Sequence, residues 1–207
     1  MAARIEHTIL RPDATRAEVE ATLADAVALG CRAVCVHPCW VAALRGAGLP
    51  IVTVAGFPLG ADRPEAKARA AALAMDDGAS EIDMVVNLGM LKSNDLAAVA
   101  ADVRAVRRAI PDGTLKVILE TGFLGAAEAE AAARVAVAEG ADFLKTSTGF
   151  GPRGATVEDV LLLRRFGRVK AAGGIRTFEE AAALVAAGAE RLGASAVAAI
   201  LSGASGA

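Results

Sequence analysis

Hydrophobic and polar positions repeat one pattern four times along the chain. In each repeat an alanine-rich, helix-like stretch stops at a glycine, and a short apolar segment follows. The glycines are Gly30, Gly78, Gly140 and Gly188. Glycine at a helix end is typical of a left-handed cap, and the apolar segments lack the alternation of half-exposed strands. The pattern therefore predicts helix–strand units whose strands are covered on both faces.

A further strand is predicted in each interval between these repeats, and one more precedes the first helix. These strands span residues 4–8, 51–55, 115–120 and 168–172. Helices are predicted over residues 15–29, 64–77, 95–110, 126–139, 156–166 and 178–187. Eight strands alternating with helices predict an α/β fold, a (β/α)8 TIM barrel, with residues 1–207 as a single domain. The alternative is an open, doubly wound parallel sheet.

Composition narrows the class of protein. The 207 residues carry a formal net charge of −2 and are 55% hydrophobic, which excludes a disordered chain. Near-neutral charge and 3% aromatic residues argue against a nucleic-acid groove. No uncharged apolar run reaches about 18 residues, so we expect no transmembrane helix and no membrane partner. Three cysteines do not make a disulfide framework, so we expect a cytoplasmic protein.

The glycine caps also predict which residues share a height in the barrel. Five residues past the caps stand Cys35, Asp83, Lys145 and Gly193, on strands two, four, six and eight. Each layer of a barrel interior is supplied by alternate strands, and barrel enzymes keep their chemistry at the carboxyl-terminal mouth. We therefore expect Asp83 and Lys145 to lie in one interior layer near that mouth.

The five lysines divide by their surroundings. Lys67 and Lys92 stand among polar residues and are predicted to be solvated, and Lys116 starts a strand and could face a helix. Lys145 and Lys170 lie inside strands, where an ammonium group is costly unless it is paired or deprotonated. The alternative is that both point outward and extend their amines between the helices.

Two lysines and a carboxylate in one mouth favour a specific chemistry. A second ammonium group and partial desolvation both lower the pKa of a lysine. A neutral amine can attack a carbonyl carbon and form a Schiff base. Asp83 could pair with one lysine and relay protons. This set of groups requires no metal and no cofactor.

Two glycine-containing strand ends favour a phosphate site. Gly173 and Gly174 follow the predicted seventh strand, and Gly193 and Ser195 stand at the end of the eighth. Backbone N–H groups at such positions can face an anion, and barrels often bind phosphate after strands seven and eight. The alternative for the glycine pair is a tight turn.

Together these motifs resemble the deoxyribose-phosphate aldolase family of class I aldolases, over residues 5 to 200. The motifs are Glu6-His7-Thr8-Ile9-Leu10 with Pro12-Asp13-Ala14-Thr15, Val34-Cys35-Val36-His37-Pro38, Gly56-Phe57-Pro58-Leu59-Gly60, Glu81-Ile82-Asp83-Met84-Val85, Leu115-Lys116-Val117-Ile118-Leu119-Glu120-Thr121, Lys145-Thr146-Ser147-Thr148-Gly149-Phe150-Gly151, and Lys170-Ala171-Ala172-Gly173-Gly174-Ile175-Arg176-Thr177.

The resemblance implies reversible cleavage of 2-deoxy-D-ribose 5-phosphate to acetaldehyde and D-glyceraldehyde 3-phosphate by a homo-oligomer, a dimer or tetramer. It implies that Lys145 is the Schiff-base nucleophile, that Lys170 lowers the pKa of Lys145 and helps proton transfer, and that Asp83 is the proton-relay carboxylate, working through a water molecule. The positions that match substrate or phosphate contacts are Gly173, Gly174, Gly193, Ser195 and Thr148.

Three features depart from the family pattern. Glu6 stands where the family usually has Asp, and Ala196 stands where a second Ser commonly follows Ser195. Some members end in a tail with a functional Tyr, whereas this chain contains no Tyr. These departures bear on rate and phosphate affinity more than on the reaction type.

Two other kinds of site fit the sequence less well, and two other functions remain as alternatives. Cys31, Cys35 and Cys39 could suggest an iron–sulfur cluster, but common cluster spacings differ. His7 and His37 are too few for the ligand set of a metal-dependent aldolase. A transaldolase-like enzyme is the nearest enzymatic alternative, and a catalytically inactive barrel with a binding role is the alternative from another class.

Overall fold

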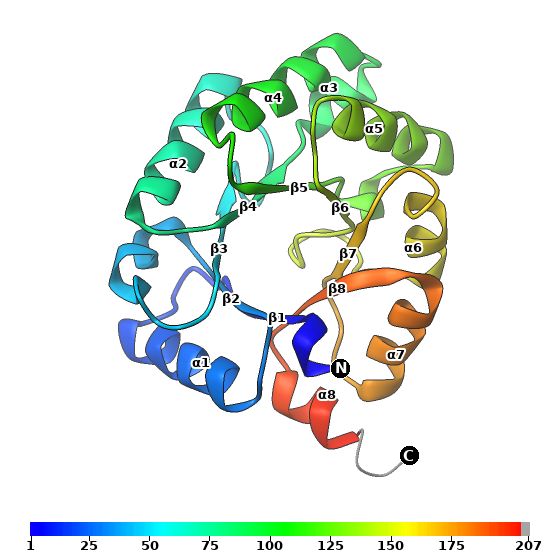
Figure 1. The fold of residues 1–207 in the computed structure, drawn as a ribbon. Coiled ribbons are helices and arrows are strands. Elements are labelled where there is room, and N and C mark those ends of the chain that lie inside the picture. Colours follow the sequence, from blue (N-terminus) through cyan, green and yellow to red (C-terminus); the bar gives the residue numbers. More distant parts are fainter. Residues whose placement is uncertain (204–207) are drawn as a thin grey trace.

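Eight parallel strands close into a barrel in the computed structural model, which describes residues 1–203 (Figure 1). Each strand pairs with its neighbour in sequence, and the first pairs with the last, so the predicted (β/α)8 barrel is confirmed. The single-domain organisation stays a prediction. The strands are β1 (Ile5–Ile9), β2 (Ala33–Val36), β3 (Ile51–Ala55), β4 (Glu81–Val85), β5 (Thr114–Ile118), β6 (Phe143–Lys145), β7 (Val169–Ala172) and β8 (Ala189–Ala194).

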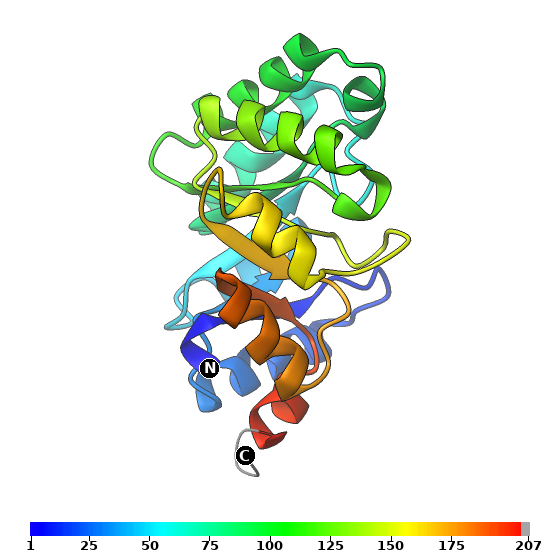
Figure 2. The ribbon, with the colours of Figure 1, turned by 90° about the vertical axis from the view of Figure 1, so that its right-hand side faces the viewer.

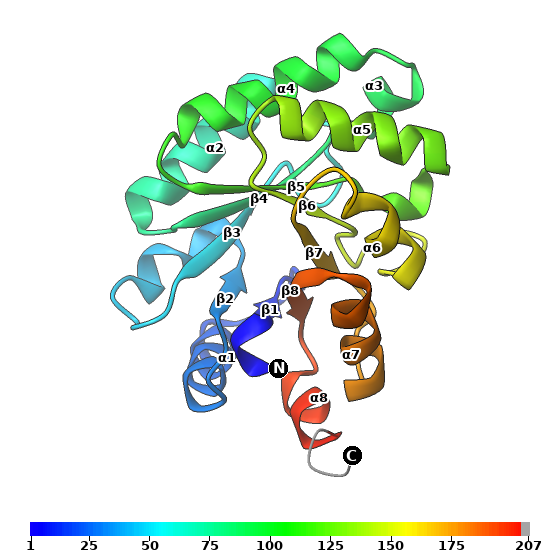
Figure 3. The same cartoon turned by 45° about the vertical axis from the view of Figure 1, so that its right-hand side comes forward.

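Helices surround the barrel, with α4 and α5 at one end of the molecule and α7 and α8 at the other in side view (Figures 2 and 3). Two short 3-10 turns, Pro38–Trp40 and Ala42–Leu44, stand between β2 and β3 in place of an α-helix. The α-helices are α1 (Arg16–Ala28), α2 (Pro64–Asp77), α3 (Leu88–Lys92), α4 (Leu96–Ala109), α5 (Ala126–Ala138), α6 (Val157–Leu163), α7 (Phe178–Ala187) and α8 (Val197–Gly203).

The four predicted glycine caps all have positive φ, at 67° for Gly30, 114° for Gly78, 92° for Gly140 and 116° for Gly188. A residue with a β-carbon rarely adopts this conformation, so glycine ends each helix and lets the chain turn into the next strand. The equivalence of the four caps, on which the predicted interior layer depends, therefore holds in the structure.

Two apolar clusters lie on opposite faces of the strands. The larger one fills the space between strands and helices and includes Val34, Ile82 and Leu144. The smaller one lies inside the barrel and contains Cys35 and Val54 from β2 and β3. Because β2 and β3 make one side of the interior apolar, its charged groups gather on the other strands.

Lys67 corrects one prediction, because its side chain is buried rather than solvated. Its Nζ lies 2.6 Å from Asp102 Oδ2 of α4 and donates to the Val85 carbonyl oxygen at 2.9 Å. Burial raises the pKa of Asp102, and the Lys67 ammonium opposes that rise. Lys67 lies on the same face of α2 as the buried residues Ala71 and Ala74. This helical spacing indicates burial, whereas the polar residues next to Lys67 in the sequence suggest exposure.

No helix within residues 1–203 is long and apolar enough to cross a membrane. Residues 204–207, on which the expectation about a carboxyl-terminal tail falls, lie outside the described part of the chain.

Candidate active site

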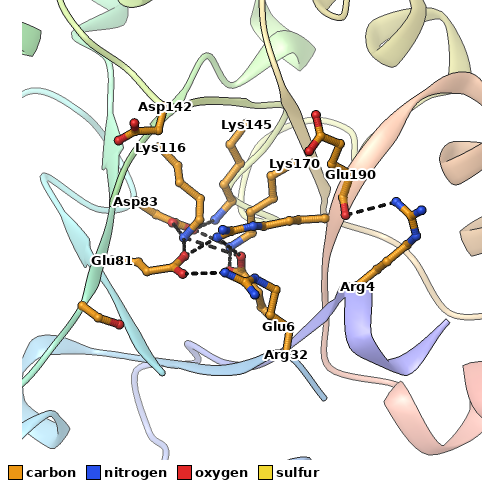
Figure 4. Close-up of polar contacts among 12 residues, drawn as sticks. Arg4, Glu6, Arg32, Glu81, Asp83, Lys116, Asp142, Lys145, Lys170 and Glu190 are labelled. Carbon is orange, nitrogen blue, oxygen red and sulfur yellow. Dashed lines mark hydrogen bonds and ion pairs between the residues drawn. The ribbon is translucent and has the colours of Figure 1, made fainter. Parts of the chain in front are cut away.

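Within the described residues, four basic and three acidic side chains occupy the barrel interior (Figure 4). None of these residues is more than 6% exposed. Residues paired across parallel strands point to the same face, and the register pairs Asp83 with Lys116 and Lys145 with Lys170. The seven residues are Glu6 on β1, Glu81 and Asp83 on β4, Lys116 on β5, Lys145 on β6, Lys170 on β7 and Arg191 on β8.

Asp83 is the centre of this cluster, as the convergence of three lysines in Figure 4 shows. Its Oδ2 lies 2.7 Å from Lys145 Nζ and 2.6 Å from Lys170 Nζ. Its Oδ1 accepts from Lys116 Nζ at 2.9 Å. Burial raises the pKa of Asp83, but the three neighbouring lysines outweigh burial and hold it well below its usual range. Asp83 is therefore a carboxylate at neutral pH, in direct contact with both predicted catalytic lysines.

The two lysines differ in their electrostatic surroundings. Burial lowers the pKa of Lys145, and the neighbouring Lys170 cation lowers it further against the opposing effect of Asp83. Burial also acts to lower the pKa of Lys170, but Asp83 and Glu6 outweigh burial and raise it above its usual range. Glu6 is hydrogen-bonded to Lys170. Lys145 is thus the amine that loses its proton more readily, and Lys170 stays an ammonium group.

A cavity of about 450 Å³ opens above this cluster. Lys145 lines it, whereas Asp83 and Lys170 lie outside its lining and are fully buried. The predicted substrate and phosphate positions all line the same cavity: Thr148, Gly173, Gly174, Gly193 and Ser195. The structure therefore brings every predicted site residue either to the cavity wall or directly beneath it.

Glycine occupies these positions of the cavity wall for two different structural reasons. Gly173 and Gly174 have φ values of 92° and 78°, and a β-carbon on Gly173 would meet Ser147 Cβ and Gly154 Cα at 3.3 Å. A β-carbon on Gly193 would lie 3.1 Å from Lys170 Cε. The glycine pair thus permits a strained turn beside the cavity, while Gly193 leaves room for the Lys170 side chain.

Thr148 lies in the loop after β6. Its hydroxyl donates to the buried Glu120 carboxylate and accepts from the Phe150 N–H at 3.0 Å. Glu120 itself, two residues after the end of β5, has a positive φ of 42°. Two hydrogen bonds therefore fix the Thr148 hydroxyl in the loop that borders the cavity.

Several residues of the site are not evident from the sequence. Lys116, for which the sequence left a helix-facing orientation open, is fully buried inside the barrel and contacts Asp83. Its register with Asp83 places both on the inner face, which the sequence could not show without the strand pairing. Phe150 also lines the cavity and packs edge-on against Phe57, with ring centroids 5.5 Å apart.

The histidines and cysteines do not converge within residues 1–203. No group of three or more His, Cys, Asp and Glu side chains there could hold a metal ion. His37 Nε2 lies 2.8 Å from the Leu10 carbonyl oxygen, and burial lowers the pKa of His7. Cys31 and Cys35 are buried, whereas Cys39 is exposed.

A closed parallel barrel with buried lysines and a carboxylate under its cavity fits an enzyme of the aldolase type, and comparison with known proteins shows that class. The model of the DeoC/LacD family of aldolases matches residues 2–207. The deoxyribose-phosphate aldolase of Thermus thermophilus is 50% identical, with 100% of this chain and 97% of the relative covered. The chain belongs to the DeoC/LacD aldolase family, whose members are carbon–carbon lyases.

Solved structures agree with this membership. A putative deoxyribose-phosphate aldolase from Coccidioides immitis superimposes with a TM-score of 0.95 at 41% identity, covering 99% of this chain and 85% of that one. The deoxyribose phosphate aldolase of Aeropyrum pernix, described as having a unique tetrameric structure, gives a TM-score of 0.92 at 30% identity. That match covers 99% of this chain and 90% of the Aeropyrum chain.

Proposed function

We propose that the protein catalyses the reversible cleavage of 2-deoxy-D-ribose 5-phosphate to acetaldehyde and D-glyceraldehyde 3-phosphate through a Schiff base on Lys145. The observation that carries the proposal is the contact of one Asp83 oxygen with both Lys145 and Lys170 beneath a cavity that Lys145 alone of the three lines. Relatives named deoxyribose-phosphate aldolase, at 46–50% identity over nearly the full chain, support the choice of substrate.

The reaction begins when the neutral amine of Lys145 attacks the C1 aldehyde carbon of the open-chain sugar. The adduct takes up a proton and loses water to form a protonated imine, which can accept an electron pair. The C3 hydroxyl then loses its proton, the C2–C3 bond breaks, and its electrons move into an enamine. Release of glyceraldehyde 3-phosphate, protonation of C2 and hydrolysis of the imine give acetaldehyde and free Lys145.

Asp83 and Lys170 supply the proton transfers in this scheme. Asp83 contacts both amines, so it can accept a proton from one and return it through a water molecule to the substrate. Lys170 is an ammonium group before the reaction, so it can pass a proton to the shared Asp83 carboxylate, and it repels a proton on Lys145, which keeps the nucleophile available. No step requires a metal ion or a cofactor.

The phosphate group is proposed to bind where the glycines line the cavity. Gly173 and Gly174 follow β7, and Gly193 and Ser195 lie at the end of β8. Backbone N–H groups and a serine hydroxyl are suitable donors to a phosphate dianion. With phosphate held there, the sugar chain would extend across the cavity toward Lys145.

Acetaldehyde release tests the proposed reaction. The purified protein is incubated with 2-deoxy-D-ribose 5-phosphate, and acetaldehyde is followed by its reduction with alcohol dehydrogenase and NADH. We expect steady release without added metal and undiminished release with EDTA. A transaldolase-like enzyme would transfer a three-carbon unit between sugars instead, so transfer without acetaldehyde would contradict the proposal.

Ser195→Glu should separate phosphate binding from chemistry. The exposed Ser195 side chain lines the cavity, and a carboxylate there would face the phosphate with like charge. We expect KM for the phosphorylated sugar to rise about tenfold or more, because like-charge contacts in an interface cost several kcal/mol. KM for unphosphorylated 2-deoxy-D-ribose should stay unchanged. An equal effect on both substrates would contradict the placement of the phosphate.

We also propose that the chain works as a homo-oligomer, a dimer or tetramer, in the cytoplasm. The tetramer named for the Aeropyrum pernix relative supports the first point, and the three free thiols Cys31, Cys35 and Cys39 support the second. Light scattering after size-exclusion chromatography should give a mass of two or four chains, and a monomer mass at micromolar concentration would contradict the oligomer.

A further inference from the structure

The lower part of the interior cluster takes no part in the proposed chemistry. Lys116 Nζ lies 2.6 Å from Glu81 Oε2, and Glu81 also pairs with Arg191. Arg191 in turn lies 3.3 Å from Glu6 Oε1. These contacts form a continuous chain of charges below Lys145, and none of the four side chains lines the cavity. The chain of charges nevertheless ends on Asp83, which both lysines of the site share.

The buried contacts determine the balance of positive and negative charge in the barrel interior. Burial of unbalanced charge is costly, so a closed interior favours equal numbers of anions and cations. The three carboxylates Glu6, Glu81 and Asp83 are matched by three cations when Lys116, Lys170 and Arg191 are all protonated. A proton on Lys145 would make a fourth cation, and the one carboxylate that Lys145 contacts, Asp83, is shared with Lys116 and Lys170.

The electrostatics of the individual groups agree with this count. Burial acts to lower the pKa of Lys116, but Asp83 and Glu6 outweigh burial and raise it. Burial acts to raise the pKa of Glu6, but Lys116 and Lys170 outweigh burial and lower it. An arginine keeps its proton in proteins. Lys145 is the basic group of the interior whose pKa moves downward.

The remaining groups around Lys145 leave the count unchanged. From β2, Cys35 faces Lys145, and burial raises the pKa of its thiol to about 11, so it is neutral. Arg32 reaches Glu81 at 3.4 Å, but its side chain is 38% exposed and is therefore screened by solvent. The inward-facing residues Val52 and Val54 of β3 are apolar, and β8 contributes Gly193 beside the cavity, so none of these three residues adds a charge near Lys145. Asp83 and Lys170 act on Lys145 from β4 and β7, and Glu6 and Lys116 contact these two groups from β1 and β5.

We propose that Lys116 and Glu81 are positioning residues, which set the charge balance of the barrel interior so that Lys145 is the amine left neutral. The inference rests on the proposed role of Lys145 and extends it to two residues that touch no substrate. Lys116 takes one oxygen of Asp83, and Glu81 holds Lys116 and Arg191 in place below.

Single and paired charge removals test the proposal. Lys116→Met leaves three carboxylates against two other cations, so Lys145 should keep its proton. Removal of this neighbouring cation should raise the pKa of Lys145 by about one unit. We therefore expect the rate at which the borohydride-trapped acetaldehyde adduct forms at pH 7 to fall about tenfold and to recover at higher pH. Glu81→Gln removes an anion and should move the acidic limb of the kcat/KM profile to lower pH.

The double variant Lys116→Met with Glu81→Gln is the decisive comparison. It removes one cation and one anion, so the acidic limb should return toward that of the original protein although both side-chain contacts are lost. A purely structural role predicts that the double variant is at least as impaired as Lys116→Met. Lys92→Met serves as the matched control, because Lys92 is 45% exposed and pairs with Glu128 on the surface.

Folding does not prevent this test. In Lys116→Met, Asp83 keeps Lys145 and Lys170, and Glu81 keeps Arg191, so neither carboxylate loses every partner. Circular dichroism and thermal unfolding check that each variant is folded. If Lys116→Met does not fold, the proposal is tested by Glu81→Gln alone, whose acidic limb of the kcat/KM profile should move to lower pH. An unmoved acidic limb in the folded variants overturns the charge-balance proposal while adduct formation on Lys145 stands. Adduct formation without Lys145 would instead overturn the proposed function.

Discussion

Lys145→Ala should show no borohydride-trapped acetaldehyde adduct and no cleavage above the uncatalysed rate. The Lys145 amine lines the cavity, and the other two lysines of the cluster do not, so no second amine can reach the substrate in its place. The fold should persist, because Asp83 keeps its contacts with Lys116 and Lys170 after the truncation.

Two measurements check this result. Cleavage is followed by acetaldehyde release, and the reduced adduct by the mass of the intact protein. Lys92→Ala, a truncation of an exposed lysine, provides the control and should retain both turnover and adduct. A folded Lys145→Ala protein that still turns over substrate would refute the assigned nucleophile.

Lys170→Leu should have the second largest effect. The substitution removes a buried cation that contacts Asp83 and Glu6 and repels a proton on Lys145. Loss of a proton-transfer partner lowers rates by about 10²–10⁴-fold in other enzymes, and we expect kcat to fall within that range. Because a like charge is lost, the pKa of Lys145 should rise, and the acidic limb of the kcat/KM profile should move to higher pH.

The pH profile separates the two parts of this effect. Raising the pH should restore the neutral fraction of Lys145 but not the missing proton transfer, so part of the loss should remain at the alkaline plateau. Glu6 keeps Arg191 as a partner in the variant, which favours retention of the fold. An acidic limb at its original position would contradict the coupling between the two lysines.

The sequence predicted the barrel and much of the site for a simple physical reason. Glycine caps with positive φ recur before alternate strands, so a fixed offset from each cap marks one height in the barrel. Asp83 and Lys145, found at that offset, are in contact in the structure. Gly173, Gly174 and Ser195 were placed at the ends of the last two strands, and all three line the cavity.

The missed residues depend on pairing between distant elements. Whether Lys116 points inward follows from its register with Asp83 on β4, and a strand boundary that is uncertain by one residue reverses that direction. The partner of Lys67 lies on α4, 35 positions along the chain, and their contact follows from helix packing that local polarity does not indicate. Gly193 was assigned to phosphate, whereas its missing side chain also makes room for Lys170.

The most direct test of the central claim is peptide mapping by mass spectrometry after reduction of the acetaldehyde complex with borohydride. The claim is that the amine of Lys145 is neutral and reaches the cavity, while those of Lys170 and Lys116 are charged and buried. We predict a single added ethyl group on the peptide that carries Lys145. An ethyl group on Lys170 or Lys116, or an unmodified protein under conditions that support turnover, would contradict the account.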